Sequence, residues 1–273
     1  MTKHQAPSTT TPLKNTTVIT RIRNRNVILA ETLKNWLQFN VPEIIIVDFR
    51  DDGCESAWDV VSEVSDSRVK VVETKYEYMF CPSIAWNLGI AQANTEYVLL
   101  MDVDDTMEPH FFETNVLIEN GYICGQGMGS LTGICYIKQE YLNAVGGFSE
   151  NMLYMGTADW DLYERLRNAG YSQCSLSANS AKHKNHPVTL KIINQLQDTS
   201  RLQNNGNSYN MWRHFNYLNV VIGKMLPWSE TSPRIQWNVT ELEMNRYLAL
   251  RDVVSKRQNL LNAGDGRYES KNL

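Results

Sequence analysis

The sequence predicts an α/β domain in which a mostly parallel sheet is covered by helices on both faces. Strand and helix signals alternate from Thr17 onwards, and residues 44–47 form a β-branched run, as in strands that are buried on both faces. In addition, the apolar strand at residues 97–101 runs straight into three carboxylates within residues 102–105. Because ligands collect at the carboxyl ends of strands in such folds, we expect this edge of the sheet to carry the functional site.

The first elements alternate between strand and helix. The predicted strands cover residues 18–22, 44–47, 69–72 and 97–101, and the predicted helices cover residues 27–39, 56–64 and 84–93. Leu33 and Trp36 carry the helical spacing of the first helix, and Ser83 is expected to cap the third. This order implies right-handed crossovers that place helices on both faces of the sheet.

Further along the chain the signals become sparser. We predict a strand at residues 131–137, a short helix at 141–145 that Gly146 and Gly147 close, and a helix at 159–169. The polar start and the fading of strand signals after residue 188 suggest three segments. These are a disordered lead-in (1–16), a main catalytic domain (17–188) and a helical C-terminal extension (189–273).

Composition excludes several classes of protein. With 26 basic and 30 acidic residues the net charge is −4, which gives no general attraction to nucleic acid or anionic membranes. The five cysteines are odd in number and lack C-x-x-C spacing, so they indicate reduced thiols instead of a disulfide framework or a zinc site. No apolar run approaches the roughly 20 residues of a membrane span. The start also lacks the apolar stretch of a signal peptide. We therefore expect a soluble, cytoplasmic protein.

Three predicted loops at one sheet edge carry charged residues. Arg21, Arg23 and Arg25 end the first strand and enter a helix, where guanidinium groups and helix N–H groups together can bind a diphosphate. Asp48 ends the second strand and can accept a hydrogen bond from a pyrimidine or a ribose. The acids at residues 102–105 offer the oxygen ligands that Mg²⁺ and Mn²⁺ prefer. Each loop alone also fits a solvated turn, but a metal–diphosphate site explains all three together.

Several of these segments resemble one enzyme family. Residues 18–25 with Trp36 and Leu37 are similar to the opening of the β-1,4-galactosyltransferase group, and residues 80–93 resemble the helix before its metal strand. Residues 101–104 then resemble the Asp-x-Asp motif, and residues 133–171 the acceptor-side block. From Thr17 to Pro187 the chain therefore resembles GT-A-type glycosyltransferases, in particular family 2 and the β-1,4-galactosyltransferase group.

The resemblance implies roles for individual residues. The implied donor-nucleotide ligands are Arg21, Arg23, Arg25, Asp48, Asn87 and Asp102. Asp104 becomes the direct ligand of Mn²⁺ or Mg²⁺, and a histidine of the His-x-x-His-Pro pattern completes the coordination. His183 is the first choice for that histidine and His186 the second. Asp105 is left either as an acid that forms the turn or as one that contacts the metal ligands without binding the metal ion itself.

The resemblance also implies a catalytic base. The Gly-x-Glu-Asp-x-Asp block of the family corresponds to residues 156–161, so that Asp159 aligns with the base. Capping of the helix that starts there is the alternative role for this acid. Ala158 stands where the family has a glutamate that helps to hold the acceptor, which is a departure from the pattern. Trp160, Asp161 and Tyr154 are implied on the acceptor and sugar side.

These inferences define an expected activity. The chain is expected to transfer a sugar from a UDP-sugar to a hydroxyl acceptor on a glycan or glycoconjugate, with inversion and with a divalent metal ion. Galactose and N-acetylgalactosamine are preferred over glucose and N-acetylglucosamine. One alternative is a catalytically inactive module that binds nucleotide sugars or partners, as the missing glutamate would suggest. Another is a nucleotidyltransferase, which is disfavoured because residues 21–26 contain no glycine.

Overall fold

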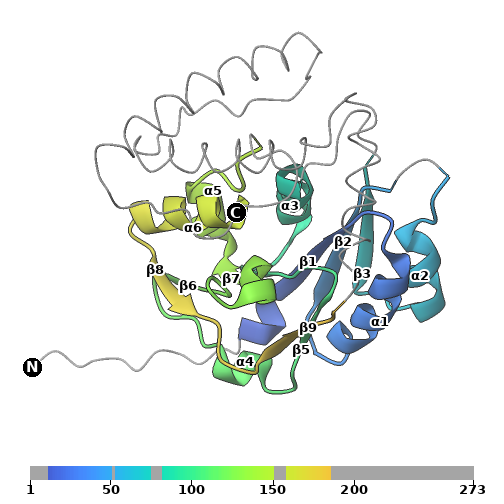
Figure 1. The fold of residues 1–273 in the computed structure, drawn as a ribbon, viewed down its shortest axis with the longest axis horizontal. Helices are drawn as coiled ribbons and strands as arrows, with labels where there is room; N and C mark the ends of the chain where they lie inside the picture. Colours follow the sequence, from blue (N-terminus) through green and yellow to red (C-terminus); the bar gives the residue numbers. More distant parts are fainter. Residues whose placement is uncertain (1–11, 51–52, 75–81, 151–157, 186–273) are drawn as a thin grey trace, which may run out of the picture.

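The computed structural model describes residues 12–50, 53–74, 82–150 and 158–185. Their main feature is a seven-stranded sheet with the strand order β3-β2-β1-β4-β7-β6-β8 (Figure 1). Its strands are β1 (Thr16–Ile22), β2 (Glu43–Asp48), β3 (Val69–Glu73), β4 (Tyr97–Leu100), β6 (Gly121–Cys124), β7 (Cys135–Lys138) and β8 (Ser172–Ser175). The helices are α1 (Asn26–Trp36), α2 (Ala57–Val64), α3 (Pro82–Gln92), α4 (Phe111–Thr114), α5 (Gln139–Ala144) and α6 (Ala158–Asn168). The predicted α/β class with a mostly parallel sheet is confirmed.

Two buried layers enclose the parallel half of the sheet. Because successive side chains of a strand point to opposite faces, Val18 of β1 packs in the layer with α1 and α2, whereas Ile19 packs in the layer with α3, α5 and α6. Ile44 and Ile45 of β2 divide between the two layers in the same way. Figure 1 shows α1 and α2 on one side of the sheet and α3, α5 and α6 on the other. This two-sided burial explains the uninterrupted β-branched run in the sequence.

The second half of the sheet differs from the prediction. β7 runs antiparallel to both β4 and β6, and neither β6 nor β8 was predicted. The strand predicted at residues 131–137 begins only at Cys135, because Gly129–Gly133 forms the 3₁₀ helix η2. The predicted cap at Ser83 is wrong, since α3 already includes Pro82, which suits a first turn because it has no N–H to leave unpaired.

The ends of the described chain bear on the predicted segments. Residues Pro12–Asn15 form the 3₁₀ helix η1 and Thr16 begins β1, so regular structure starts inside the predicted lead-in. The predicted C-terminal extension, residues 189–273, lies outside the described residues, so this division stays a prediction. Within the described ranges, no helix combines the length and the apolar character needed to cross a membrane.

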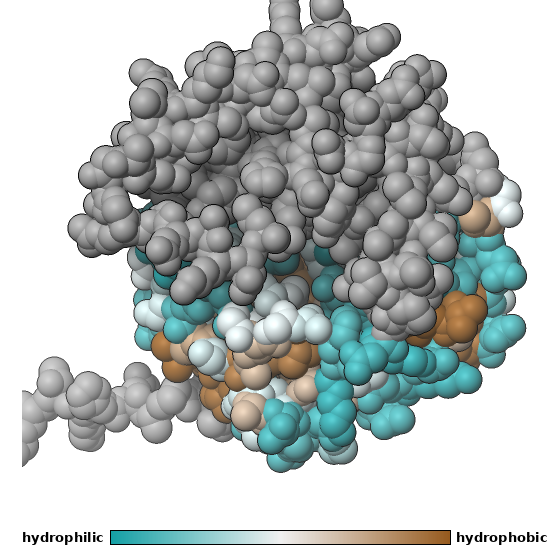
Figure 2. All heavy atoms as spheres, in the orientation of Figure 1, coloured by the Kyte–Doolittle hydropathy of each residue, from teal (hydrophilic) through white to brown (hydrophobic). Residues whose placement is uncertain are grey.

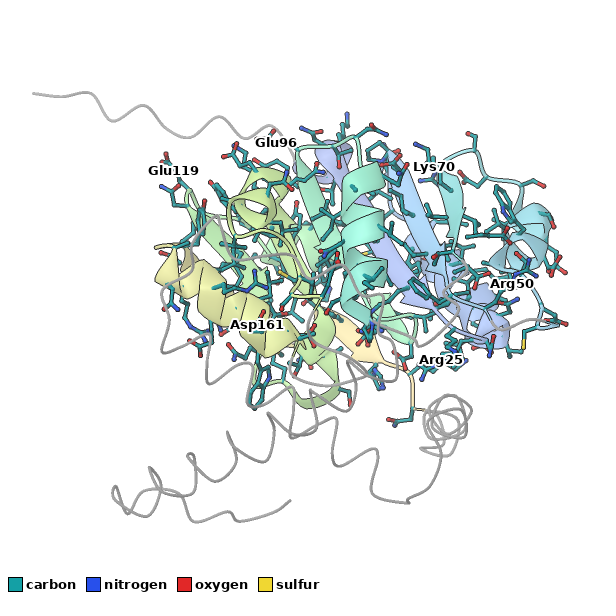
Figure 3. All side chains as sticks on the ribbon, turned by 90° about the horizontal axis from the view of Figure 1, so that it is seen from above. Arg25, Arg50, Lys70, Glu96, Glu119 and Asp161 are labelled. Carbon is teal, nitrogen blue, oxygen red and sulfur yellow. The ribbon has the colours of Figure 1, made fainter. Side chains whose placement is uncertain are left out.

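Strand register brings the chemistry to one edge of the sheet. Ile22 pairs with Asp48 between β1 and β2, and Ile19 pairs with Leu100 between β1 and β4, all in parallel. The carboxyl ends of the three strands therefore meet, as the sequence predicts. Figure 3 shows Arg25 and Asp161 toward this end of the domain and Lys70 and Glu96 toward the opposite end.

A short antiparallel ribbon lies beside this edge. It consists of β5 (Asp105–Met107) and β9 (Ala181–His183), with Asp105 directly opposite His183. Helix α1 holds the ribbon in place: Trp36 Nε1 donates to the Asp105 carbonyl at 3.0 Å, and the Asn35 side chain bonds the Met107 N–H and C=O at 2.8 and 2.9 Å. The ribbon is thus fixed relative to β1, which leads into α1.

The described surface mixes polar and apolar residues. Figure 2 shows hydrophilic residues over much of one face, with separate hydrophobic patches among them. The exposed large apolar side chains are Val27, Trp58, Val116, Ile118 and Trp160. Of these, Trp160 is itself predicted on the acceptor and sugar side and follows Asp159 in the sequence.

Close packing of α3 on the sheet generates a stability prediction. A Cβ added at Gly89 would lie 2.4 Å from Cγ2 of Ile19 and 3.1 Å from Cγ2 of Val47, both in the core. We expect Gly89→Val to cost about 1–3 kcal/mol through overpacking, which lowers the Tm by several °C. Gln92→Ala, at an exposed position of the same helix, should change stability by no more than about 0.5 kcal/mol. Equal melting temperatures of the two variants would contradict this packing.

Candidate active site

Three carboxylates follow β4 in a tight turn. The Asp105 N–H donates to the Asp102 carbonyl at 3.0 Å, which reverses the chain directly after the strand. Asp104 and Asp105 are 2% and 0% exposed, so this turn carries buried acids. Gly133 of η2 leaves the space for the first acid, because a Cβ there would lie 2.5 Å from Oδ2 of Asp102. The turn is therefore built to hold charge in a protein interior.

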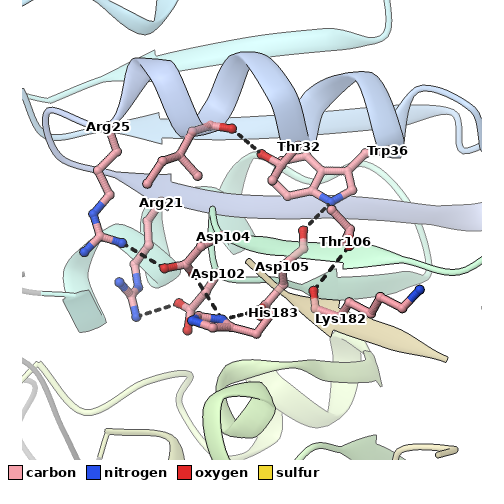
Figure 4. A network of polar contacts seen from close by, with 11 residues as sticks. Arg21, Arg25, Thr32, Trp36, Asp102, Asp104, Asp105, Thr106, Lys182 and His183 are labelled. Carbon is pink, nitrogen blue, oxygen red and sulfur yellow. Dashed lines mark hydrogen bonds and ion pairs between the residues drawn. The ribbon is translucent and has the colours of Figure 1, made fainter. Parts of the chain in front are cut away.

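Arginines from β1 and from the start of α1 balance these acids (Figure 4). Arg21 Nη2 lies 3.2 Å from Asp102 Oδ1, and Arg25 Nη1 donates to Asp104 Oδ2 at 3.1 Å. The Arg21 guanidinium also lies 4.8 Å from the centre of the Trp86 ring, in cation–π range. Arg23, between the two in sequence, is buried, whereas Arg21 and Arg25 are partly exposed. The structure thus brings together the basic loop and the Asp-x-Asp motif.

Asp104, Asp105 and His183 form a group that can hold a metal ion. One ligand atom from each residue lies within 4.8 Å of the others. His183 Nδ1 is 2.8 Å from Asp105 Oδ1 and 3.8 Å from Asp104 Oδ1. Asp105 Oδ2 is buried and has no hydrogen-bond partner among the described residues, and burial raises the pKa of this carboxyl. Two carboxylates with one imidazole, and a buried oxygen in need of positive charge, fit a divalent cation.

The predicted base lies at the start of α6. Burial raises the pKa of Asp159 to about 7, the charge of Asp102 adds to this shift, and Arg21 opposes it. Asp159 is therefore close enough to the carboxylate turn to be influenced by it electrostatically. Ala158, at the position of the family's glutamate, is buried in the core layer of α3, α5 and α6. Trp160 is 47% exposed beside Asp159.

Asp48 has backbone partners for both carboxylate oxygens. The Arg50 N–H donates to Oδ1 at 3.1 Å, and the Ala57 N–H donates to Oδ2 at 2.8 Å. Asp48 is 1% exposed and so secures the start of α2 at the sheet edge. Each oxygen can accept a second hydrogen bond, so its predicted nucleotide contact stays a prediction.

Asn87 and Asp161 hold the segment that follows α5. The Asn87 side chain accepts from the Phe148 N–H at 2.8 Å and donates to the Phe148 carbonyl at 2.9 Å. Asp161 is 5% exposed and pairs with Arg165, whose guanidinium donates to two backbone carbonyls of the same segment. No pattern in the sequence predicts these contacts, since they depend on how the segment lies on α3 and α6.

Two of the predicted site residues cannot be located, and a third residue has a contact that the sequence does not show. Tyr154, on the predicted sugar side, and His186, the second histidine choice, lie outside the described residues. The sequence left Asp105 as a turn acid or a residue behind the ligands and did not foresee its contact with His183. That contact follows from the pairing of β5 with β9, and these strands of three residues each are too short to show a periodicity in the sequence.

Three solved structures with a similar fold are of glycosyltransferases. A mannosyltransferase from Pyrobaculum calidifontis in complex with GDP-Man and Mn²⁺ has a TM-score of 0.51 and 16% identity over 94% of this chain and 88% of that one. A Drosophila β1,4-galactosyltransferase 7 mutant with manganese, UDP-Gal and xylobiose has a TM-score of 0.50 and 15% identity over 73% and 79%. The catalytic domain of the same Drosophila enzyme with xylobiose gives 0.50 and 16% over 72% and 79%. At these identities the likeness concerns the fold.

Family models match the sequence itself. The model for glycosyl transferase family 2 matches residues 17–128, and the model described as the N-terminal domain of galactosyltransferase matches residues 125–214. The two models adjoin and together match residues 17–214, so the chain is similar to GT-A-type glycosyltransferases in sequence as well as in fold. Comparison with curated proteins gives no match for this chain. The expected resemblance to family 2 and to the galactosyltransferases is thereby confirmed.

The raised pKa of Asp159 generates a prediction for the stability of this protein. The native carboxyl group keeps its proton up to about pH 7, whereas an ordinary one loses it near 3.8. The native state therefore binds more protons between these values, and stability falls as the pH rises through them. We expect Asp159→Asn to have a higher Tm than the wild type at pH 8, because the variant has no carboxylate to bury. Each kcal/mol gained should raise the Tm by roughly 2–4 °C. Towards pH 4 this advantage should disappear.

Asp59→Asn provides the matched control, because Asp59 also lies in the first turn of a helix and accepts from the Ser56 N–H at 3.0 Å. That change keeps an oxygen that can accept from the Ser56 N–H but removes a negative charge from the first turn of α2, so it should lower the Tm at pH 8. Differential scanning calorimetry measures both. A fall in the Tm of Asp159→Asn at pH 8, like that of the control, would show that Asp159 acts as a helix cap.

Proposed function

We propose that this glycosyltransferase transfers a hexose from a UDP-sugar to a hydroxyl group of a glycan or glycoconjugate, with inversion at the anomeric carbon. The observation that carries the proposal is the position of Asp159. A carboxyl group with a pKa of about 7 lies within electrostatic influence of Asp102, in a site that also holds a metal-binding group of side chains and two arginines. Perturbed acids in such surroundings are typical of catalytic groups.

Asp159 acts in this proposal as the general base. The acceptor oxygen forms its bond to the anomeric carbon while the bond from that carbon to the diphosphate oxygen breaks, and the leaving UDP takes the electron pair. Asp159 receives the proton of the acceptor hydroxyl. A base whose pKa lies near the working pH combines a populated deprotonated form with a useful affinity for the proton.

Arginines and the metal group act on the donor. Arg21 and Arg25 offer guanidinium forks to the diphosphate, and α1 begins directly after Arg25, so its N-terminal N–H groups add to the positive potential. Mn²⁺ or Mg²⁺ held by Asp104 and His183 would supply positive charge that stabilises the leaving diphosphate. Asp102 is the proposed partner of the ribose.

The choice of donor rests on similarity. The mannosyltransferase structure contains GDP-Man with Mn²⁺, and the galactosyltransferase structure contains UDP-Gal with manganese and xylobiose. The arginine loop of this chain resembles the galactosyltransferase loop, and the second family model is that of a galactosyltransferase. These similarities favour UDP-galactose or UDP-N-acetylgalactosamine over UDP-glucose and UDP-N-acetylglucosamine, with a glycan as acceptor.

Nucleotide release tests the proposed activity. With Mn²⁺ and a panel of the four UDP-sugars and GDP-mannose, we expect UDP release from one or more UDP-sugars. Asp159→Asn and Asp104→Ala should each reduce the rate by about 10²–10⁴-fold, since they remove the base and a metal ligand. Asp59→Asn should keep the wild-type rate. Release that is absent across the panel, or that survives both changes, would favour an inactive binding module.

The Arg25–Asp104 pair generates a second test. Arg25 donates to an oxygen of the proposed metal ligand Asp104, so Arg25 and a cation compete for it. In the donor complex we propose that Arg25 turns to the diphosphate. Arg25→Ala should therefore tighten Mn²⁺ binding in the absence of nucleotide and weaken UDP binding in the presence of Mn²⁺ by about 10–100-fold, as expected for a lost charged hydrogen bond. Titration calorimetry measures both affinities.

Arg167→Ala serves as the control for this test, because Arg167 lies in the last turn of α6 and pairs with Glu164. It should leave both affinities unchanged. If Arg25→Ala weakens Mn²⁺ binding together with UDP binding, Arg25 supports the metal group and does not compete with the ion.

A further inference from the structure

We propose that Asp105 is a positioning residue that holds the His183 imidazole by its Nδ1–H, so that Nε2 is the nitrogen that binds the metal ion. This inference rests on the metal site of the proposed function and deepens it. It gives a task to the one acid of the turn that the family resemblance leaves without one.

The distances assign Nδ1 to Asp105. Nδ1 lies 2.8 Å from Asp105 Oδ1, a hydrogen-bond distance, and 3.8 Å from Asp104 Oδ1, which is beyond one. The exposed fractions show which side chain lies deeper: that of Asp105 is 0% exposed, and that of His183 is 13% exposed. A metal ion that must meet a diphosphate lies toward the open side, so Asp105 lies behind the imidazole.

The backbone fixes this arrangement. Asp105 and His183 are register partners in the β5–β9 ribbon, so their side chains share a face and lie close to each other. On one side Trp36 holds the Asp105 carbonyl, and on the other the Lys184 N–H donates to the Asp104 carbonyl at 2.6 Å. The carboxylate is therefore anchored at both of its neighbouring peptide groups.

A carboxylate behind a histidine has a defined effect on metal binding. It selects the tautomer with the proton on Nδ1, which leaves the lone pair on Nε2, and it makes that nitrogen a stronger donor. The second oxygen of Asp105 is buried without a hydrogen-bond partner among the described residues. A buried carboxylate with so few partners is costly, and a cation on the far side of His183 supplies the missing positive charge.

Mn²⁺ spectroscopy tests this role without measuring activity. In the wild type we expect Mn²⁺ bound with a histidine ¹⁴N coupling in pulsed electron paramagnetic resonance. Asp105→Ala should bind Mn²⁺ about 10–100-fold more weakly and should lose or reduce the coupling although His183 is still present. Asp105→Asn, which keeps an oxygen that can accept from Nδ1–H, should restore the coupling in part. Thermal melting without metal shows whether each variant is folded.

Glu108→Gln is the matched control, since Glu108 pairs with Lys182 at 2.7 Å across the same two chain segments but at their exposed side. It should leave the Mn²⁺ affinity and the coupling unchanged. An intact histidine coupling in Asp105→Ala, accompanied by one additional coordinated water, would make Asp105 a direct ligand and overturn the inference. Unchanged Mn²⁺ affinity in both Asp105 variants would overturn it too. Wild-type protein that shows the coupling but releases no UDP would instead count against the proposed function alone.

Discussion

The site depends on the concentration of negative charge at one edge of the sheet. Two unit charges 4 Å apart near a protein surface interact by about 4 kcal/mol, so Asp102 and Asp104 could not lie together without counter-charges. Arg21 pairs with the first, Arg25 with the second, and His183 lies beside the turn. β1 delivers one arginine, the start of α1 the other, and the β5–β9 ribbon the histidine. The positions of β1, α1 and the β5–β9 ribbon thus determine which side chains surround the acids.

Glu43, at the opposite edge of the sheet, is a buried acid with a structural role and differs from the acids of the candidate site. Burial alone would raise the pKa of Glu43, but hydrogen bonds from Lys70 and Thr17 outweigh it, and the pKa is lowered. Asn94 adds a backbone N–H at 3.3 Å. A buried acid with a full set of partners stabilises its surroundings. At the carboxyl edge, by contrast, the pKa of Asp159 is raised, so its charged form is destabilised. Such destabilised charges are typical of functional sites, where a bound substrate or metal ion completes the set of partners.

Local pattern was sufficient for the parallel half of the fold. Two-sided burial makes residues 44–47 of β2 apolar without interruption and places Val18 and Ile19 side by side in β1, and this signal is visible without knowledge of the neighbouring strands. β8, with the sequence Ser-Gln-Cys-Ser, has no such signal and is a strand because it pairs with β6. The apolar Leu131 suggested a strand, but η2 forms there, and Gly133 at its end leaves room for Asp102. In both places a tertiary contact overrides the local preference.

The same distinction applies to the site. That Arg21 and Arg25 would meet the Asp-x-Asp acids followed from the rule that parallel strands end at one edge. The separate roles expected for Asp104 and Asp105 came from the family resemblance, because adjacent acids look alike in a sequence. In the structure Asp104 lies in the turn and contacts Arg25, whereas Asp105 is the first residue of β5 and contacts a histidine 78 residues away. The pairing of β5 with β9 brings Asp105 to that histidine, and no local pattern in the sequence shows this contact.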